Sequence, residues 1–491
     1  MDEQNSKSPP MPLGTLPAWG HDELPAPLPF STRNLFRTIG PGAILLATSI
    51  GAGEWVIGPM ISVNSGTGIM WIATVAILVQ LVFNMEAIRY TLYTGEPMII
   101  GFMRMKPGSG FWSTIYTVLT IAQLGLPAMS ATCALVLFAA ISGREAGEDD
   151  ETMVHLWTYA IILVTVVILL SGRTIERVLE YISWVMVAFI FTFLIAVNVI
   201  FVPLSHWLQT IVGFFQFGNV PANVDLLLLG TLAAMAGSGG VGNLVITNWY
   251  RDKGFGMGAK VGAITSAFSG ADDHRTFIGK VFSINAENMQ RWRAWWRYVI
   301  ADQVFLWAMG CFVGMYLNVN LATHLSDSAE PLDPYHSGVF QARLMAETLW
   351  SGFWFLALLN GFWLLFKTNL GDTDILVRTV TDILWIASPK LRAKRSLTIS
   401  KLYYGLLALF TAWFFVGVNW GNALTLFTIM GNVAGPILAF GAIQILLVNT
   451  RLLPVEIRPK LWQRLGLVAC CVFYSVISLA LLWKYLPFHG D

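Results

Sequence analysis

Two glycine clusters are the parts of this sequence best suited to binding a solute. Gly51-Ala52-Gly53-Glu54 and Gly237-Ser238-Gly239-Gly240 each lie midway along an apolar segment. Such clusters release backbone N–H and C=O groups from the helical ladder, and at membrane depth these groups need protein or a bound solute as partners. Paired broken helices are typical of the central site of a secondary transporter. The residues expected to contact the substrate are Gly51, Ala52, Gly53, Glu54, Gly237, Ser238, Gly239 and Gly240.

The chemistry of these clusters favours a small anion. If both helices break, the half-helices beyond the breaks point their N-termini at the site, and each N-terminus carries about half a positive charge and unsatisfied N–H donors. Ser238-Gly239-Gly240 presents consecutive N–H groups with little side-chain bulk, and Ser238 adds a hydroxyl. A small planar oxyanion such as bicarbonate fits a site of this size.

Glu54 is the carboxylate of these clusters, and a fixed carboxylate repels an anion unless a cation neutralises it. The side chain could simply complement the dipole of its helix, which is worth about 0.3–1 kcal/mol. At bilayer depth, however, ionisable side chains indicate function by default. We therefore expect Glu54 to bind a co-transported Na⁺ or H⁺ that couples anion entry to a gradient.

Other polar residues in the apolar segments are further candidates. Asn432, near a proline, could supply a ligand for the coupling ion or hydrogen-bond to a neighbouring helix. Asp302 is a second candidate for the coupling ion, although a position at the membrane interface explains it better. Lys367 and Asp372 are expected to form a salt bridge or to line an inner vestibule, and we favour the salt bridge.

Membrane-spanning helices must position these residues. Of the 491 residues, 55% are hydrophobic and only 12% are charged, against roughly 25% charged in an average soluble domain. A hydrocarbon core of about 30 Å needs about 20 apolar residues per helix. The segments that meet this requirement, numbered here as spans 1 to 11, are 40–62, 68–92, 113–141, 156–172, 180–203, 226–249, 297–320, 347–368, 402–419, 422–448 and 463–485.

The distribution of charge predicts the orientation of the chain. Residues 1–35 are polar and rich in proline, without the apolar core of a cleaved signal, so we expect a disordered cytoplasmic tail. With this tail inside, only Arg144, Arg343 and Lys484 of the 30 Lys and Arg residues face outward, as the positive-inside rule requires. The C-terminus is then outside. The expected location is a prokaryote-like plasma (inner) membrane.

The two breaks are expected to belong to one site. Spans 1–5 and spans 6–10 each begin with a glycine-interrupted helix, and an odd number of spans per unit turns the second unit upside down. In inverted repeats the first helices of both units break near the midplane, where their inner ends meet. We predict an all-α polytopic membrane protein with a 5+5 inverted repeat. Its parts are the tail (1–35), a first repeat (36–203), a second repeat (204–449), and span 11 with the C-terminus (450–491).

Several short motifs match those of a known family. Gly40-Pro41-Gly42-Ala43 and the later Ile50–Trp55 stretch are similar to a Gly-Pro-Gly followed by Asp-Pro-Gly-Asn-Trp. Glu86–Arg89 with Thr94-Gly95 resembles an Ala-Arg-Leu and Thr-Gly pair, and Arg173–Arg177 resembles a basic-acidic stretch. These motifs resemble the Nramp (natural resistance-associated macrophage protein) transporters over roughly residues 36–450. The resemblance implies a leucine-transporter-like fold of eleven helices with helices 1 and 6 broken.

The residues that hold the metal in that family are replaced here. By the resemblance, the family's metal-binding aspartate aligns with Gly51 and its asparagine with Glu54. The methionine, proline and histidine of its sixth helix align with Gly237, Ser238 and Gly239. All seven histidines lie outside the spans, so neither sulfur nor imidazole is expected at the site. A hard-cation alternative remains, because Mg²⁺ with most of its water shell, or Mn²⁺, could use a glycine-lined cavity with one carboxylate.

Other function classes receive less support. The chain has no His-Glu-x-x-His zinc motif and no Gly-x-Ser-x-Gly elbow, which argues against an enzyme. Broken helices around one site suit alternating access better than a continuous pore, while a non-transporting receptor on the same scaffold stays open. Packing is the expected role of the cysteines in the spans, which are Cys133, Cys311, Cys470 and Cys471. We expect no cofactor, no metal centre and no nucleic-acid partner, only a small inorganic ion and the lipid bilayer. A monomer is compatible with the sequence.

Overall fold

Membrane-length helices make up most of the molecule. The computed structural model describes residues 16–171, 175–222, 224–261, 278–326, 339–394 and 397–485. Within these ranges, ten segments are long and apolar enough to cross a membrane. The predicted span 6 is instead two short helices in sequence, α11 (Leu226–Met235) and α12 (Val241–Asp252). Together these segments account for the eleven predicted spans, and the chain is an all-α integral membrane protein.

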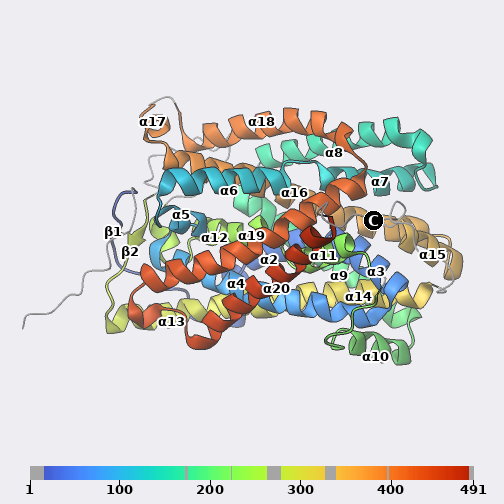
Figure 1. Cartoon of the computed structure of the whole chain (residues 1–491), viewed down its shortest axis with the longest axis horizontal. Helices are drawn as coiled ribbons and strands as arrows, with labels where there is room; N and C mark the ends of the chain where they lie inside the picture. The colour runs from blue at the N-terminus through green and yellow to red at the C-terminus, as the bar shows by residue number, and fades with distance from the viewer. Residues whose placement is uncertain are drawn as a thin grey trace, which may run out of the picture.

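The spans run along the long axis of the molecule (Figure 1). Spans made of one helix are α4 (Trp71–Thr94), α8 (Glu151–Leu170), α9 (Ile175–Phe201), α16 (Phe353–Ala387), α18 (Ile399–Gly417), α19 (Ala423–Arg451) and α20 (Leu461–Tyr485). Spans made of joined segments are α2 (Pro41–Ser49) with η1 (Gly53–Ile57) and α3 (Gly58–Ser65), α6 (Ser109–Leu124) with α7 (Ala128–Ser142), α11 with α12, and α13 (Ala286–Ile300) with η5 (Ala301–Ala308) and α14 (Met309–Leu325).

Short elements close the two ends of the bundle (Figure 1). At one end lie β1 (Gly20–His21), β2 (Lys280–Val281), α5 (Met98–Met103) and α17 (Pro389–Arg392), and at the other lie α10 (Leu204–Gly213) and α15 (Phe340–Thr348). β1 and β2 pair in parallel, with Gly20 opposite Lys280. α1 (Thr32–Thr38) precedes span 1. We refer to the β1–β2 end and the α10–α15 end of the molecule.

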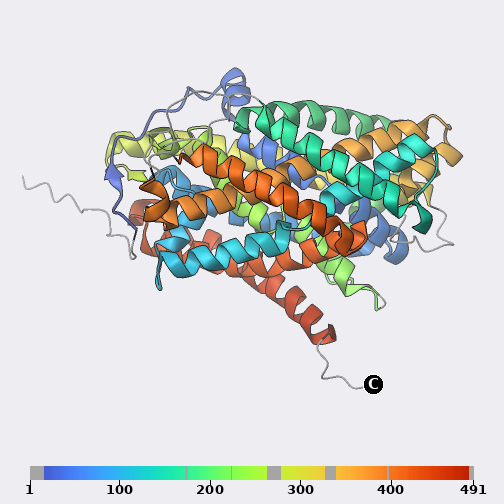
Figure 2. The same ribbon diagram turned by 90° about the horizontal axis from the view of Figure 1, so that it is seen from above.

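Span 1 occupies the centre of the bundle. Its most apolar stretch is wholly buried, whereas only 17% of the corresponding stretch of α20 is buried. α2 packs against α9, α12, α16 and η5, and α20 leaves the side of the bundle towards its C-terminal end (Figure 2). A central, broken first helix fits the inverted repeat expected from the sequence. The division into repeats after residues 203 and 449 stays a prediction.

Residues 17–29 pack along the β1–β2 end, so the prediction of a disordered tail is wrong for this part of residues 1–35. Trp19 Nε1 donates to Glu96 Oε2 at 3.1 Å, Arg104 Nη1 donates to the Pro17 carbonyl at 2.8 Å, and Trp295 Nε1 donates to the Pro25 carbonyl at 2.8 Å. Proline removes a backbone donor but leaves its carbonyl acceptor, and this proline-rich segment docks through those carbonyls. Residues 1–15 and 486–491 lie outside the described residues.

Glu96 anchors the docked segment, and its ionisation should control the docking. Burial by itself would raise the pKa of Glu96, but attraction to Arg104 and hydrogen bonds from Arg104, Tyr90 and Trp19 outweigh burial and lower the pKa. A carboxyl with a lowered pKa in the folded state contributes stability above its ordinary pKa and loses it as the pH falls through the folded value. We therefore expect the segment to stay docked at neutral pH and to release only in acid.

Glu96→Gln should release residues 17–29 at neutral pH, because the amide cannot pair with Arg104. Limited proteolysis with chymotrypsin, which cuts after aromatic and leucine side chains such as Trp19 and Leu24, measures the release. Glu23→Gln is the control, because Glu23 is an exposed residue of the same segment. Equal protection of Glu96→Gln and the wild type would contradict the anchoring role.

Candidate substrate site at the paired helix breaks

Span 1 changes conformation at its glycine cluster. α2 ends at Ser49, and after residues 50–52 a π-helical turn runs from Gly53 to Ile57. α16 packs closely on this bend, because a Cβ atom on Gly51 would collide with the Thr368 hydroxyl. One on Gly371 of α16 would likewise collide with the Thr48 hydroxyl of α2. Small residues therefore let α16 lie directly against the break.

Span 6 is interrupted over the second glycine cluster. α11 ends at Met235 and α12 begins at Val241. Gly239 and Gly240 have φ angles of 62° and 65°, in the left-handed region that glycine adopts without steric penalty. The glycines thus allow the chain to turn and to restart as a helix with its N-terminus at the break.

The two breaks meet, as expected for an inverted repeat. A Cβ atom on Gly53 would lie only 2.6 Å from the Met235 carbonyl oxygen, so the backbones of the two spans are in contact. Ser49 Oγ and Ser238 Oγ are 2.6 Å apart. Trp307 Nε1, on η5, lies 3.0 Å from the first hydroxyl and 3.1 Å from the second. A tryptophan and two serines therefore join spans 1, 6 and 7.

Two glutamines satisfy the backbone freed by the break in span 6. Gln80 of α4 accepts from Ser238 N at 2.9 Å and donates to the Ala234 carbonyl at 3.2 Å. Gln123 of α6 accepts from Val241 N at 3.0 Å and donates to the Gly239 carbonyl at 2.7 Å. The sequence predicted consecutive free amides that cradle an anion. In the observed conformation the amides of Ser238 and Val241, and the Ser238 hydroxyl, are already engaged.

Glu54 is the charged group at the meeting point. Its side chain is fully buried, and Oε2 accepts from Gly51 N at 2.9 Å. Oε1 has no hydrogen-bond partner among the described residues, and no Lys or Arg in the described ranges forms a salt bridge with Glu54. The carboxylate therefore holds the bend of span 1 with one oxygen and keeps the other available for a ligand.

Sulfur atoms also lie at the site, contrary to expectation. Cys311 of α14 lies near Ser49 and Glu54, close enough to interact electrostatically with the Glu54 carboxylate. The Met235 sulfur lies against the turn, 2.8 Å from where a Cβ atom on Gly239 would stand. The family's metal-binding positions align only with spans 1 and 6, so they point neither to a cysteine in span 7 nor to Met235, which lies just before the aligned residues.

The two further candidates for the coupling ion lie away from the breaks. Asp302 is fully buried and caps the start of α2, where its Oδ2 accepts from Gly42 N at 2.7 Å and from Tyr250 Oη at 2.5 Å. The nine residues from Gly42 to Gly51 correspond to about 13 Å of helix. Asp302 therefore does not reach the substrate site, and its predicted position near the membrane interface stays a prediction.

Asn432 joins two helices. Its Nδ2 donates to the Leu227 carbonyl and to Thr231 Oγ1 of α11, both at 3.1 Å. These contacts lie at least one helical turn from the end of α11 at Met235. The helix–helix hydrogen bond that the sequence allowed is the contact present.

Lys367 and Asp372 do not form the expected salt bridge. Both residues belong to the described part of the chain, and neither Lys367 Nζ nor Asp372 Oδ2 has a hydrogen-bond partner there. Residues five apart on a helix are separated by about 140° around its axis, so these side chains cannot face each other directly. The two side chains thus have no salt bridge with each other inside the bundle.

Solved structures of other membrane proteins have folds similar to this one. No protein-family model and no curated protein matches the chain. The structure of a manganese transporter from Eremococcus coleocola, in complex with an aromatic bis-isothiourea substituted compound, is similar with a TM-score of 0.65 at 12% identity, over 96% of this chain and 92% of that one. MhsT in complex with L-phenylalanine is similar with a TM-score of 0.51 at 13% identity, over 91% and 98% of the chains. At these identities the likeness concerns the fold. This chain has the leucine-transporter-like fold that the resemblance implied, with the helix breaks that its two glycine clusters predicted.

Proposed function

We propose that this protein is a secondary transporter of a divalent metal cation that works by alternating access. The observation that carries the proposal is the buried Glu54 carboxylate at the meeting of the two broken helices, whose Oε1 has no hydrogen-bond partner in the described part of the chain. A buried carboxylate without a basic partner is costly unless a cation compensates it. The likeness in fold to a protein described as a manganese transporter supports the same class of cargo.

The donor atoms around Glu54 favour a transition metal over Mg²⁺. Carboxylate, hydroxyl and carbonyl oxygens suit Mg²⁺ and Mn²⁺ alike, whereas sulfur ligands favour first-row transition metals over Mg²⁺. Cys311 and Met235 supply sulfur beside the break. The described residues contain no group of three or more His, Cys, Asp or Glu suited to a metal, so hydroxyl and backbone oxygens would complete the shell. We therefore propose Mn²⁺ as the cargo.

Bicarbonate is the competing cargo. The feature in its favour is the N-terminus of α12 at the break, with Gly239 and Gly240 before it. Two observations weaken it: glutamine side chains occupy the Ser238 and Val241 amides, and the nearest charged group is an anion. Binding an anion here would require both the release of a glutamine and a cation on Glu54.

We propose that the β1–β2 end faces the cytoplasm of a prokaryote-like cell, with the N-terminus inside and the C-terminus outside. Positive residues gather around the docked segment at this end, and cytoplasmic loops are enriched in such residues. Those in contact with it are Arg104, Lys260, Lys280 and Arg291. Transport is coupled to a Na⁺ or H⁺ gradient.

Flux measurements on purified protein in liposomes test the proposal. Uptake of Mn²⁺, Mg²⁺ and radiolabelled bicarbonate is measured in parallel, with an inward H⁺ gradient, an inward Na⁺ gradient or neither. We expect saturable Mn²⁺ uptake that a gradient of one coupling ion accelerates, weaker Mg²⁺ uptake and no bicarbonate uptake. Gradient-driven bicarbonate accumulation without Mn²⁺ uptake would overturn the metal assignment and favour the anion.

A further inference from the structure

We infer that Asp372, assisted by Lys367, is a proton-binding site that couples transport to a H⁺ gradient. The role of this site in coupling rests on the proposed function. The proton-binding site itself rests on the local geometry of α16 and span 3. It lies between the break in span 1 and a third helix break, in span 3. The coupling ion is thereby assigned as H⁺ and placed on α16, away from Glu54.

Span 3, the apolar segment 113–141 of the sequence analysis, is broken into two helices. α6 ends at Leu124 and α7 begins at Ala128, with Pro127 between the two helices. Proline cannot donate the backbone hydrogen bond that a continuing helix needs. Trp413 Nε1 of α18 donates to the Gly125 carbonyl at 2.8 Å. A tryptophan from another span therefore stabilises the break.

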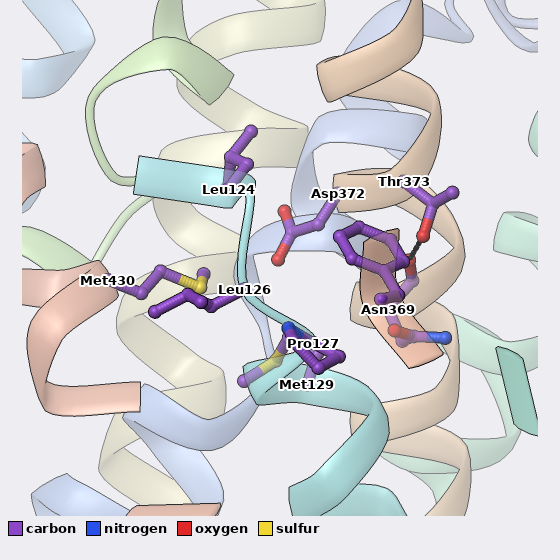
Figure 3. Close-up of a pocket in the computed structure, with 9 residues that line it drawn as sticks. Leu124, Leu126, Pro127, Met129, Asn369, Asp372, Thr373 and Met430 are labelled. Carbon is purple, nitrogen blue, oxygen red and sulfur yellow. Dashed lines mark hydrogen bonds between the residues drawn. The ribbon is translucent and has the colours of Figure 1, made fainter. Parts of the chain in front are cut away.

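A small cavity lies at this break, and Asp372 points from α16 toward it (Figure 3). Its volume is about 10 Å³, which is close to the room needed for one water molecule. Apart from Asp372 the walls are Leu124, Leu126, Pro127, Met129, Asn369, Thr373, Phe414 and Met430. A carboxylate beside room for a single water molecule, among mostly apolar walls, is suited to exchanging a proton.

Lys367 is a buried lysine inside the bundle. Its side chain is only 3% exposed, and Nζ has no hydrogen-bond partner among the described residues. Lys367 interacts with Asp372 electrostatically rather than through a salt bridge. Removing an ionisable group from water without a bonded partner is costly. An ionisable residue kept in this state at membrane depth indicates a function.

The proposed step is the reversible protonation of Asp372. A proton from water on one side binds the Asp372 carboxylate, and an O–H bond forms. The same bond breaks when the proton is released to water on the other side. Lys367 is near enough to interact electrostatically with this carboxylate. No electron transfer and no further reactant is needed.

Asp372 is linked to both substrate breaks by short chains of contacts. On α16, the preceding Gly371 packs on Thr48, and Thr368 Oγ1 lies 3.4 Å from the Ile50 carbonyl at the bend of span 1. Leu124, which lines the cavity, follows Gln123, the residue that holds the start of α12. A change in charge or in hydration at Asp372 therefore acts on the helices that form the substrate site.

Other titratable groups on the helices packed against α16 have partners of their own or lie elsewhere. Cys133 of α7 directs its sulfur to the Phe362 carbonyl, and Glu54 of span 1 bonds to Gly51 N. Three further groups form bonds with partners outside the cavity: Tyr403 of α18 with Asp374, Arg251 of α12 with Asp382, and Glu180 of α9 with Lys253.

Two groups lie on other helices and also have partners. His155 of α8 pairs with Glu151 near the α7–α8 turn. Arg343 of α15 pairs with Glu145. None of these lines the cavity at Asp372.

Two measurements on Asp372→Asn test the inference. The first is infrared difference spectroscopy of the protein in lipid vesicles as the pH is changed, which detects a protonated carboxyl without any substrate. We expect a carboxyl band in the wild type that is lost in Asp372→Asn and kept in Glu54→Gln. The second is Mn²⁺ uptake with and without an inward H⁺ gradient. Asp372→Asn should lose the acceleration by the gradient but keep Mn²⁺ exchange across the membrane at zero gradient.

Further variants separate a folding defect from a coupling defect. Asp372→Glu keeps a carboxyl and should retain the infrared band and the H⁺ acceleration. Lys367→Met should move the pH midpoint of the band, and Glu287→Gln, an exposed acid on α13, should change neither measurement. Retention of the band and of the acceleration in Asp372→Asn would overturn the inference. If the wild type transports no Mn²⁺ yet shows the Asp372 band, the proposed function fails while the proton site stands.

Discussion

Glu54→Gln should abolish saturable Mn²⁺ uptake. Glu54 provides the carboxylate at the meeting of the two breaks, and its buried Oε1 has no other partner among the described residues. The amide keeps an oxygen that can accept from Gly51 N, so the bend of span 1 is retained while the negative charge is lost. Even residues that only orient metal ligands are worth about 10–100-fold in affinity or activity. Loss of the charged ligand itself should therefore reduce uptake at low Mn²⁺ by at least about 100-fold.

The measurement is the initial rate of Mn²⁺ uptake into liposomes over a range of concentrations, with protein amount and thermal stability checked for each variant. Glu287→Gln makes the same chemical change at an exposed position and should transport like the wild type. Cys311→Ser, which replaces sulfur by oxygen beside Glu54, should weaken Mn²⁺ uptake relative to Mg²⁺ uptake. Wild-type Mn²⁺ uptake by Glu54→Gln would remove the basis for a metal site at the breaks.

Much of the fold could be predicted from sequence because its signals are local. A run of about 20 apolar residues is sufficient to indicate a span, and Gly51–Gly53 and Gly237–Gly240 mark positions where a helix loses its regular hydrogen bonds. The meeting of these breaks followed from the odd number of spans in each repeat. The break in span 3 was missed although Gly125 and Pro127 stand there, because membrane helices often contain glycine and proline without interruption.

The chemistry of the site was harder to predict because it depends on contacts between distant residues. Gln80 and Gln123 stand alone in apolar runs, and only their positions on α4 and α6 bring them to the turn between α11 and α12. Trp307 and Cys311 reach the breaks from span 7 in the same way. An uncharged polar residue inside a span was the available signal, since such a group needs a partner at bilayer depth.

A network of buried charges joins the second half of span 6 to α16. Arg378 is fully buried and donates to Asp374 at 2.8 Å and to Asp252 at the end of α12. Arg251 bonds to Asp252 at 2.8 Å and to Asp382 at 2.9 Å. Two arginines therefore face three aspartates, and each arginine bridges two of them. This network holds α12 in place on the side of the substrate site nearer the β1–β2 end.

Arg378→Met should be the most destabilising single change among these residues. It leaves Asp374 and Asp252 with fewer positive partners in the interior, and breaking a buried ion pair by removing one member costs about 3–5 kcal/mol. Arg343→Met is the matched control, because Arg343 pairs with Glu145 at 3.3 Å while its side chain is 44% exposed, and exposed pairs contribute about 0–1 kcal/mol. Thermal unfolding of the purified variants in one detergent measures both. Adding Asp374→Asn to Arg378→Met should recover part of the loss, since one uncompensated carboxylate is removed. Equal unfolding temperatures for Arg378→Met and Arg343→Met would mean that the network does not hold α12 to α16.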